Sequence, residues 1–383
     1  MKKQCLDAPQ LYDHSNYQYL EWPGTQYEQN YIAPFLSSPS SNYVSNVKTK
    51  MCVLKMGEQL FPLTVNDAEY DNSYVTSPFT MYITYGKQEL RFLNNQLLSQ
   101  LLSIPLASLG TLLKVSEINR VACVNNWLLS TNLYHNLENI SLKKLTCHLI
   151  ERFPQHAIMF RSLNRHTNAA LMDSLQECGY LFVPSREVFI FDKKLKDYAH
   201  RRVTQQDFDL LKTTPYQILS HEDITEKDYE RIVELYYLLY IDKYSDCNPK
   251  FTPAFIKLCH QQKLMNFHGL RGVDGHLVGI ITSFNRNGIL ATPIVGYDTQ
   301  LSPKEGLYRM LTALSLQESL DKGLVFNMSA GVSEFKKWRG GVGFIEYSAL
   351  YCQHLPFYRR VPWNILHFLM TRIAIPMLHR YKF

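Results

Sequence analysis

The sequence predicts an α/β protein, more closely α+β, built from two tandem domains with mixed, mostly antiparallel sheets flanked by helices. With 383 residues, the chain exceeds the size at which a single hydrophobic core stops growing. A hydrophobic content of 46% supplies enough apolar surface for two large cores. Short strand-like runs alternate with longer helical periods in both halves, which is typical of mixed sheets with helices on their faces.

The first half begins with a polar N-terminal arm, residues 1–45, which is rich in Tyr, Gln, Asn, Ser and Pro and has no apolar period. Residues 46–195 are expected to form the first domain. Gly179 should end its last helix, because a glycine tolerates the left-handed C-terminal position. The charged stretch 193–202 is expected to be a linker. The expected elements are a hairpin of residues 51–54 and 59–65, helices at 88–109, 142–152 and 168–178, and strands at 120–124, 157–161, 180–184 and 188–191.

The second domain, residues 196–355, has clearer capping and turn signals. Thr225 and Asp228 form a capping box, and Thr252-Pro253 combines an N-cap with proline at the first helical position. Asp274-Gly275 and Asn287-Gly288 are strong hairpin signals. Helices are expected at 225–240, from 252 onward, from Ser302 to the stop at Gly323, and at 333–339; strands are expected at 216–219, 267–271, 276–284, 289–297, 324–329 and 344–352.

A break is expected inside the third strand of this meander. Pro293 cannot donate to a sheet ladder, and Gly296 has no side chain to pack, so strand pairing should be interrupted between them. The order of elements is therefore a three-strand meander, a helix, a strand, a helix and a strand.

This order resembles the GNAT acyltransferase fold, in which the central sheet splays to admit an acyl thioester. Asn327, Ala330 and Phe335 match positions that GNAT enzymes commonly conserve, whereas Lys336 stands where those enzymes carry tyrosine. Phe-Lys at this place is similar to the Fem-type aminoacyl transferases and the BioF2-like acetyltransferase domains. The resemblance implies a bacterial, cytoplasmic acyltransferase with a tandem GNAT architecture.

The resemblance also implies roles for particular residues. Lys336 would stabilise negative charge on the attacked carbonyl; Tyr297 would act as an acid or bind the acceptor; Asn327 completes the catalytic set. A solvated basic helix end is the alternative interpretation of Lys336, and a core tyrosine that of Tyr297. The residues expected to bind substrate in the second half are Ser329, Phe335, Arg339 and Gly296.

The donor is not fixed by the sequence. Residues 300–306 lack the glycine spacing with which GNAT enzymes hold the coenzyme A pyrophosphate, since Pro303 removes an amide and Glu305 opposes an anion. The expected donor is therefore acyl-CoA bound atypically, an acyl carrier protein thioester or an aminoacyl-tRNA. No metal or redox cofactor is implied, because no Walker loop, zincin helix or dinucleotide loop is present.

The first half resembles a degenerate copy of the same fold. Arg161 and Arg186 follow the positions of its strand and hairpin, and both are expected to bind a carboxylate or phosphate of the substrate. Structural salt bridges are the alternative.

The C-terminal segment, residues 356–383, is predicted to be a basic amphipathic helix. The chain from Ser333 to Phe383 has eight Lys and Arg and two acids, so it carries the whole formal excess of +6. Its Trp, Leu and Ile beside arginines suit an anionic membrane surface or the groove of a partner. Packing on its own domain is the alternative. The sequence shows no secretory signal, and the protein is expected to be cytoplasmic or peripheral on the inner face of the membrane.

The hypothesis is therefore acyl or aminoacyl transfer from a thioester or tRNA ester to an amine or hydroxyl acceptor, in the second domain. Two alternatives remain. One is an acyl-CoA- or acyl-carrier-dependent N-acyltransferase of small-molecule or lipid biosynthesis at the membrane surface. The other is a non-catalytic GNAT-like binding module.

Overall fold

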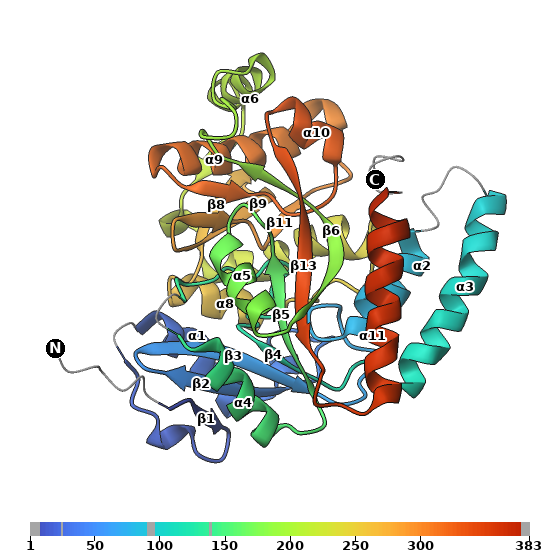
Figure 1. Ribbon diagram of the computed structural model, residues 1–383. Coiled ribbons are helices and arrows are strands. Elements are labelled where there is room, and N and C mark those ends of the chain that lie inside the picture. Colours follow the sequence, from blue (N-terminus) through green and yellow to red (C-terminus); the bar gives the residue numbers. More distant parts are fainter. Residues whose placement is uncertain (1–7, 24–25, 90–95, 138–139, 377–383) are drawn as a thin grey trace. The chain divides into compact units, whose positions relative to one another are not determined.

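The computed structural model describes residues 8–23, 26–89, 96–137 and 140–376 (Figure 1). The chain divides into two compact units. Within the described residues, unit 1 takes Met1–Ser185, Cys247–Pro249 and Glu346–Met377, and unit 2 takes Arg186–Asp246 and Lys250–Ile345. The predicted division at 195/196 and 355/356 differs from this one, because both observed boundaries fall inside strands. These strands, β6 (Leu181–Phe191) and β13 (Val342–Tyr351), contribute residues to both units.

Unit 1 has a sheet in the order β1-β2-β3-β4-β5-β13-β6. The antiparallel β2-β3-β4 meander leads through α4 to β5, which pairs parallel with β4. This is the meander and crossover that the sequence predicts. The strands are β1 (Gln10–Asp13), β2 (Lys50–Met56), β3 (Gln59–Asn66), β4 (Val121–Val124) and β5 (Ala157–Leu163); the helices are α1 (Gln26–Ser37), α2 (Tyr85–Glu89), α3 (Gln96–Val115), α4 (Leu142–Arg152), α5 (Ala169–Glu177) and α11 (Phe357–Leu369).

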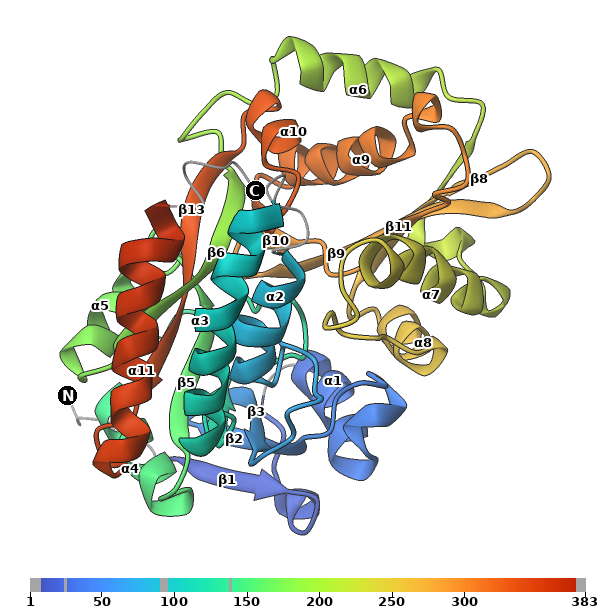
Figure 2. The same ribbon diagram turned by 90° about the vertical axis from the view of Figure 1, so that its right-hand side faces the viewer.

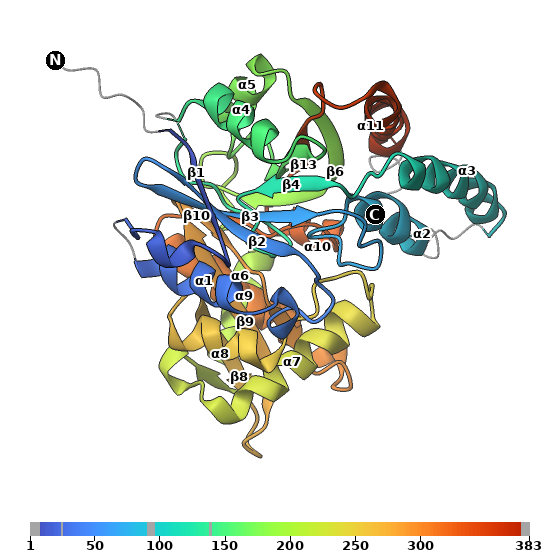
Figure 3. The same cartoon turned by 90° about the horizontal axis from the view of Figure 1, so that it is seen from below.

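Two hydrophobic cores lie on opposite faces of the unit 1 sheet, because successive strand residues point to opposite sides. Ala122 and Val124 of β4 pack in one core with residues of α4 and α5. Val121 and Cys123 pack in the other with residues of α3 and α11. Helix α1 of the N-terminal arm packs with its buried face against β2 and β3 (Figure 3). The hydroxyl of its Tyr31 donates a hydrogen bond to the backbone oxygen of Trp127.

Unit 2 repeats this arrangement in the order β13-β6-β12-β10-β9-β8-β7, with β11 paired to β9 outside that path. The β8-β9-β10 meander leads through α9 to β12, which pairs parallel with β10. The strands are β7 (Gln217–Leu219), β8 (Asn266–Arg271), β9 (Leu277–Arg286), β10 (Ile289–Ala291), β11 (Val295–Tyr297) and β12 (Val325–Asn327); the helices are α6 (Arg202–Lys212), α7 (Tyr229–Tyr237), α8 (Pro253–Gln261), α9 (Leu307–Asp321) and α10 (Ser333–Trp338).

The two parallel pairs share a backbone feature that supports an internal repeat. Ser162 in β5 has a φ of 63°, and Ser329 just after β12 has a φ of 59°. Each is followed by a helix and then by a glycine in the left-handed region, Gly179 with a φ of 84° and Gly340 with a φ of 96°. Non-glycine residues rarely adopt this conformation, so its recurrence at matching places is informative. The prediction of two GNAT-like halves with mixed sheets is confirmed by these topologies.

Several elements differ from the predictions. Part of the long helix expected at 88–109 lies outside the described residues, and the described α3 extends to Val115. Strand β6 runs unbroken through Pro184, which lies where β6 is not paired with β12, so its missing N–H breaks no bond to that strand. The charged stretch expected to be a linker ends at the start of α6, which has an apolar side at Phe208.

The turn before α9 also differs. Ser302 accepts a hydrogen bond from the amide of Lys304 and caps a separate 3-10 turn, η8 (Pro303–Glu305), instead of α9. Gly306, with a φ of 71°, then redirects the chain into α9. The capping box of Thr225 and Asp228 forms at a 3-10 turn (Glu226–Asp228) that leads into α7. The N-cap at Thr252 and the hairpin turns form as predicted.

The C-terminal segment packs on unit 1. Trp363 and Leu366 of α11 are buried in the core that α3 also contacts. The chain continues from α11 into a π-helical turn, η9 (Met370–Ala374). Arg380 and Lys382 lie outside the described residues. Within the described ranges, none of the helices combines the length and apolarity that crossing a membrane requires.

Candidate functional site

The strand pair β10–β12 opens where the sequence predicts a break. Parallel pairing ends at Ala291 and Asn327, and β11 then pairs with β9 alone among the described strands. Between β10 and β11 the chain bulges at Pro293. Thr282 of β9 holds the bulge, since its amide donates to the Ile294 oxygen at 2.9 Å and its hydroxyl accepts from the Ile294 amide at 3.2 Å. The pairing between the β10–β11 segment and β12 therefore stops beside the end of β12.

A sharp turn follows β12 at this opening. The Asn327 side chain is buried, and its Oδ1 accepts a hydrogen bond from the amide of Ser329 at 2.9 Å. Ser329, Gly331 and Val332 all have positive φ, at 59°, 82° and 43°. For the β-branched Val332 this conformation is a strained one, costing on the order of 1–3 kcal/mol. Backbone strain of this kind persists only when surrounding contacts hold it in place.

Lys336 supplies those contacts. The residue is 1% exposed, and its Nζ donates to the backbone oxygens of Met328, Ser329 and Ala330 at 2.9, 3.1 and 2.7 Å. An ammonium has three N–H donors, so the turn occupies all of them. The solvated helix end considered for Lys336 is therefore not what this residue forms. It clamps the strained turn from inside.

Two opposing effects act on the charge of Lys336. Burial lowers the pKa of Lys336 well below its usual value, and the nearby Arg186 guanidinium lowers it further. The three carbonyl oxygens act the other way, because they accept hydrogen bonds from the charged form. The Phe189 ring, with its centroid 5.6 Å from Nζ, also favours a cation.

An aromatic row connects Tyr297 to α10. The Tyr297 ring lies 6.0 Å from that of Tyr308 in α9, and Tyr308 lies 4.9 Å from Phe335. Burial raises the pKa of Tyr297 and raises that of Tyr308 well above its usual value, so both phenols stay neutral near pH 7. The neighbouring hydroxyls of Tyr240 and Tyr244 add to the effect on Tyr308. Tyr308 thus links the predicted site residues Tyr297 and Phe335, although the sequence predicts no role for Tyr308.

Arg339 is held by an ion pair inside unit 2. Its Nε lies 2.5 Å from Oδ2 of Asp207, and its Nη1 donates to the Phe335 oxygen at 3.0 Å. Asp207, on α6, has no exposed surface and also accepts from Arg309 Nε at 2.7 Å. Its role could not be predicted, because it lies more than a hundred positions from both arginines, just after the stretch expected to be a linker.

Gly296 allows a close approach between a strand and a helix. A Cβ built at this position would lie 2.5 Å from the backbone carbon of Leu235 and from the backbone nitrogen of Tyr236, both in α7. Only glycine fits there without moving the helix. Gly296 therefore packs α7 against β11, which fixes the strand that carries Tyr297.

Arg161 lies in unit 1, at the end of the parallel β4–β5 ladder. It is 2% exposed, and its Nη1 donates to the Val75 oxygen and to Asn126 Oδ1 at 3.0 and 3.2 Å. Among the residues that the structure describes, its Nε has no hydrogen-bond partner, and neither has the buried hydroxyl of Ser162 beside it. Arg161 thus forms a buried polar centre in unit 1, while Arg186 belongs to unit 2 and lies close enough to Lys336 to affect its pKa.

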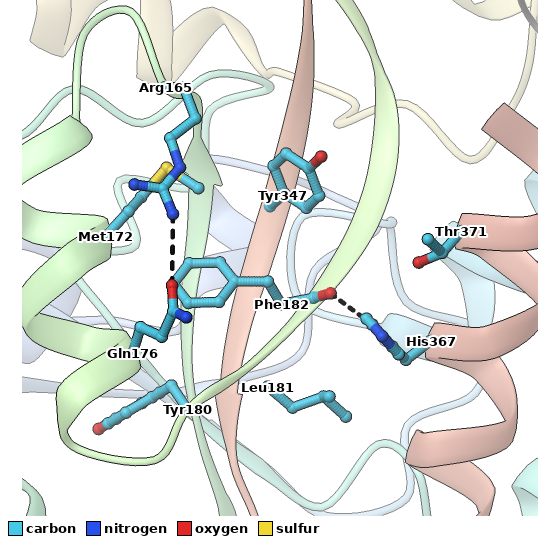
Figure 4. A pocket seen from close by; sticks show the side chains of 9 residues that line it. All are labelled: Arg165, Met172, Gln176, Tyr180, Leu181, Phe182, Tyr347, His367 and Thr371. Atoms are coloured by element: carbon cyan, nitrogen blue, oxygen red, sulfur yellow. Dashed lines mark hydrogen bonds between the residues drawn. The ribbon is translucent and has the colours of Figure 1, made fainter.

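Unit 1 also has an open hollow of about 360 Å³ beside α11 (Figure 4). Its wall is mostly apolar, from Phe182, Tyr347 and Met172. The Arg165 guanidinium reaches toward Gln176 on one side, and His367 Nδ1 bonds the Phe182 oxygen at 2.7 Å on the other. None of the predicted site residues lines it, and no sequence motif marked it.

Residues 300–306, which stand where GNAT enzymes carry their phosphate loop, form a turn whose amides bond within it. The amides of Lys304, Glu305 and Gly306 bond to Ser302 and Pro303 within the η8 turn. These amides already donate hydrogen bonds within the turn, so they are not free to bind a phosphate. This agrees with the departure of residues 300–306 from the GNAT spacing. No group of three His, Cys, Asp or Glu among the described residues is arranged to hold a metal ion.

No protein-family model and no curated protein matches this chain. Among solved structures it is similar to L-PGS from Bacillus licheniformis, at 15% identity and a TM-score of 0.43, over 60% of this chain and 76% of that one. It is similar to FemX at 7% identity and a TM-score of 0.46, over 58% and 78%. A tandem GNAT protein from the clavulanic acid biosynthesis pathway shares 9% identity at a TM-score of 0.39, over 89% and 98%.

The fold is GNAT-like in both units. This follows from the meander, the parallel crossover and the opened ladder described above. At these identities and TM-scores, the similar structures assign no activity to the chain.

Proposed function

We propose that unit 2 is an acyltransferase that moves an acyl or aminoacyl group from a thioester or tRNA ester to an amine or hydroxyl acceptor. The observation that carries the proposal is the opening of the β10–β12 ladder beside a strained turn. There, within the described strands, one side of β11 has no partner strand, next to a neutral tyrosine. An extended thioester donor can pair with the backbone groups on that side.

In this mechanism the acceptor nitrogen or oxygen bonds to the donor carbonyl carbon, and the carbon–sulfur or carbon–oxygen ester bond then breaks. The leaving thiolate or alkoxide takes a proton from the Tyr297 hydroxyl. The attacking group, which has become positively charged, returns a proton to the Tyr297 phenolate. The raised pKa of Tyr297 suits it to donate only as the leaving group departs.

Lys336 is proposed as a positioning residue, whose ammonium group holds the turn after β12. Its three donors are occupied by Met328, Ser329 and Ala330, so direct contact with an oxyanion requires one of these bonds to be exchanged. Held as it is, Lys336 keeps the amides of the strained turn in a fixed orientation beside the opened ladder. Fixed donors of this kind stabilise a developing negative charge because they need no reorganisation during the reaction.

The test uses isothermal titration with three donors in turn: acetyl-coenzyme A, an acylated carrier protein and an aminoacyl-tRNA. The donor that binds is then used to measure acyl release. We expect Tyr297→Phe to bind this donor as the unaltered protein does and to turn over about 10²–10⁴-fold more slowly, the range for a lost general acid. Tyr358→Phe is the matched control, since Tyr358 is an exposed tyrosine on α11.

A second pair of variants separates positioning from direct chemistry at Lys336. Lys336→Met removes the clamp, and Lys337→Met removes the adjacent lysine, which contacts the same Phe189 ring. We expect the first variant to lower kcat and to raise KM together, because the turn relaxes, and the second to change neither. A folded Lys336→Met protein with unchanged kinetics would exclude the role given to Lys336.

A non-catalytic binding module is the second candidate, favoured by the occupied amides of the η8 turn and the occupied donors of Lys336. It predicts that unaltered protein binds a donor without releasing its acyl group. Failure to bind any of the three donors would contradict the acyltransferase proposal.

A further inference from the structure

Helices α3 and α11 cover the same side of unit 1, where they run side by side (Figures 1 and 2). Their inner residues meet in one core, to which Leu113 of α3 and Trp363 and Leu366 of α11 belong. The remaining sides of both helices face away from that core. Because the core already accounts for the apolar inner sides, the outer sides would be expected to be polar.

Several large apolar side chains are nevertheless exposed among the described residues of both outer sides. On α11, Phe357, Ile365 and Phe368 are 72%, 36% and 58% exposed; on α3, Ile104, Leu112 and Val115 are 69%, 39% and 72% exposed. In each helix the three residues recur at i, i+8 and i+11, which places them on a single stripe. We call these six residues the α3–α11 face.

The charged side chains on these two helices are all basic, and Glu117, the acid that follows α3, is paired with Arg120 and Arg359. Neither α3 nor α11 contains an Asp or Glu. Arg372 just after α11 is exposed. Lys114 near the end of α3 is also exposed, with its Nζ 4.9 Å from the centroid of the Phe79 ring, and Arg360 is half-buried. Arg359 does not contribute, because its guanidinium is buried and bonds the backbone oxygens of Ser116 and Glu117. Large apolar side chains are thus bordered by cations with no compensating acid on either helix.

We propose that the α3–α11 face docks onto an anionic phospholipid surface. The aromatic and aliphatic side chains enter the boundary between headgroups and acyl chains, while the basic side chains meet lipid phosphates. The face consists of two exposed helix stripes, which suits a planar lipid surface better than it suits a single inserted peptide. This docking does not depend on the acyltransferase proposal, because every residue of the face belongs to unit 1.

The experiment is co-sedimentation of the full chain with two kinds of vesicle, phosphatidylcholine alone and phosphatidylcholine with an equal part of phosphatidylglycerol. We expect binding to the anionic vesicles only, and release at about 1 M salt, where the screening length falls to about 3 Å. A double variant, Ile365→Ser with Phe368→Ser, should reduce the bound fraction about tenfold or more, as expected for large side chains withdrawn from an apolar phase. Arg372→Gln should reduce it less and weaken the salt dependence.

Val273→Ser is the matched control, since Val273 is 97% exposed in the β8–β9 turn of unit 2. It should pellet like the unaltered protein. Equal pelleting of all variants, or no pelleting with anionic vesicles, would overturn the proposal. So would a dimer in sedimentation velocity that the double variant abolishes, because the face would then be an interface between two copies of the chain. Circular dichroism of each variant separates lost docking from lost folding.

Discussion

At the scale of single residues, unit 2 depends on buried charges that are held by specific partners. Lys336 donates hydrogen bonds to three carbonyl oxygens of the turn after β12. Asp207 accepts hydrogen bonds from both Arg309 and Arg339. Removing Asp207 would leave the Arg339 guanidinium buried without a compensating charge, which costs more than the pair contributes in total. The positions of Arg339 and Phe335 beside the turn therefore depend on a carboxylate in α6.

Asp207→Asn is expected to lower the free energy of unfolding by about 3–5 kcal/mol, the cost of breaking a buried ion pair by removing one partner. Asp209→Asn is the control on the same helix, because Asp209 is exposed and pairs with Lys212 at 3.2 Å. That exposed pair should contribute only about 0–1 kcal/mol. Urea denaturation followed by circular dichroism measures both, and equal losses for the two variants would contradict the assignment.

At the scale of elements, the opened ladder is kept in place from both sides of β11. On one side, α7 approaches so closely that Gly296 has no room for a side chain. On the other, Tyr297 meets Tyr308 of α9. The strand therefore cannot close onto β12 without displacing a helix, and the opening is a property of the packing.

Gly296→Ala is expected to destabilise the protein by about 1–3 kcal/mol, because the added methyl group overpacks the contact with the α7 backbone. It should also move Tyr297 and so reduce acyl release. Gly86→Ala in α2 is the control: a Cβ there meets only Leu106, at 3.9 Å, and alanine favours a helix by about 0.5–1 kcal/mol over glycine. Thermal melts rank the two variants, and a Gly296→Ala protein as stable as the unaltered one would show that α7 adjusts freely.

At the scale of the whole molecule, unit 1 is completed by the end of the chain. Strand β13 pairs with β5 through Ala349 and Leu350, and α11 adds Trp363 to the same unit. Residues 247–249 return to unit 1 from within unit 2, where the Cys247 oxygen accepts from the amide of Tyr74 and the hydroxyl of Ser73. The units are therefore interlaced along the sequence.

A chain that ends at residue 345 is expected to lose the cooperative folding of unit 1, since β5 loses a neighbouring strand and one core loses the α11 side chains. A chain that ends at residue 376 keeps these elements and serves as the control. Limited proteolysis should cut residues 1–185 of the shorter chain much faster. Equal resistance of the two chains would contradict the interlaced arrangement.

Features that depend on neighbouring residues could be predicted from the sequence. The capping box of Thr225 and Asp228, the hairpin glycines, the helix stop at Gly179 and the break at Pro293 all follow from backbone preferences within a few positions, so local patterns predict them. The repeated order of elements followed from the same signals, and with it the GNAT-like fold.

The partners of the charged side chains, and the segments that complete each unit, could be found only from the tertiary structure. The Asp207–Arg339 pair, the burial of Arg161 and the contact between Tyr297 and Tyr308 join positions far apart in the sequence. The acceptors of Lys336 are close in sequence but depend on a turn with three positive φ angles, which no local preference of Ser329 or Val332 favours. Long-range packing stabilises that turn, and for this reason the role of Lys336 could be located from the sequence but its geometry could not.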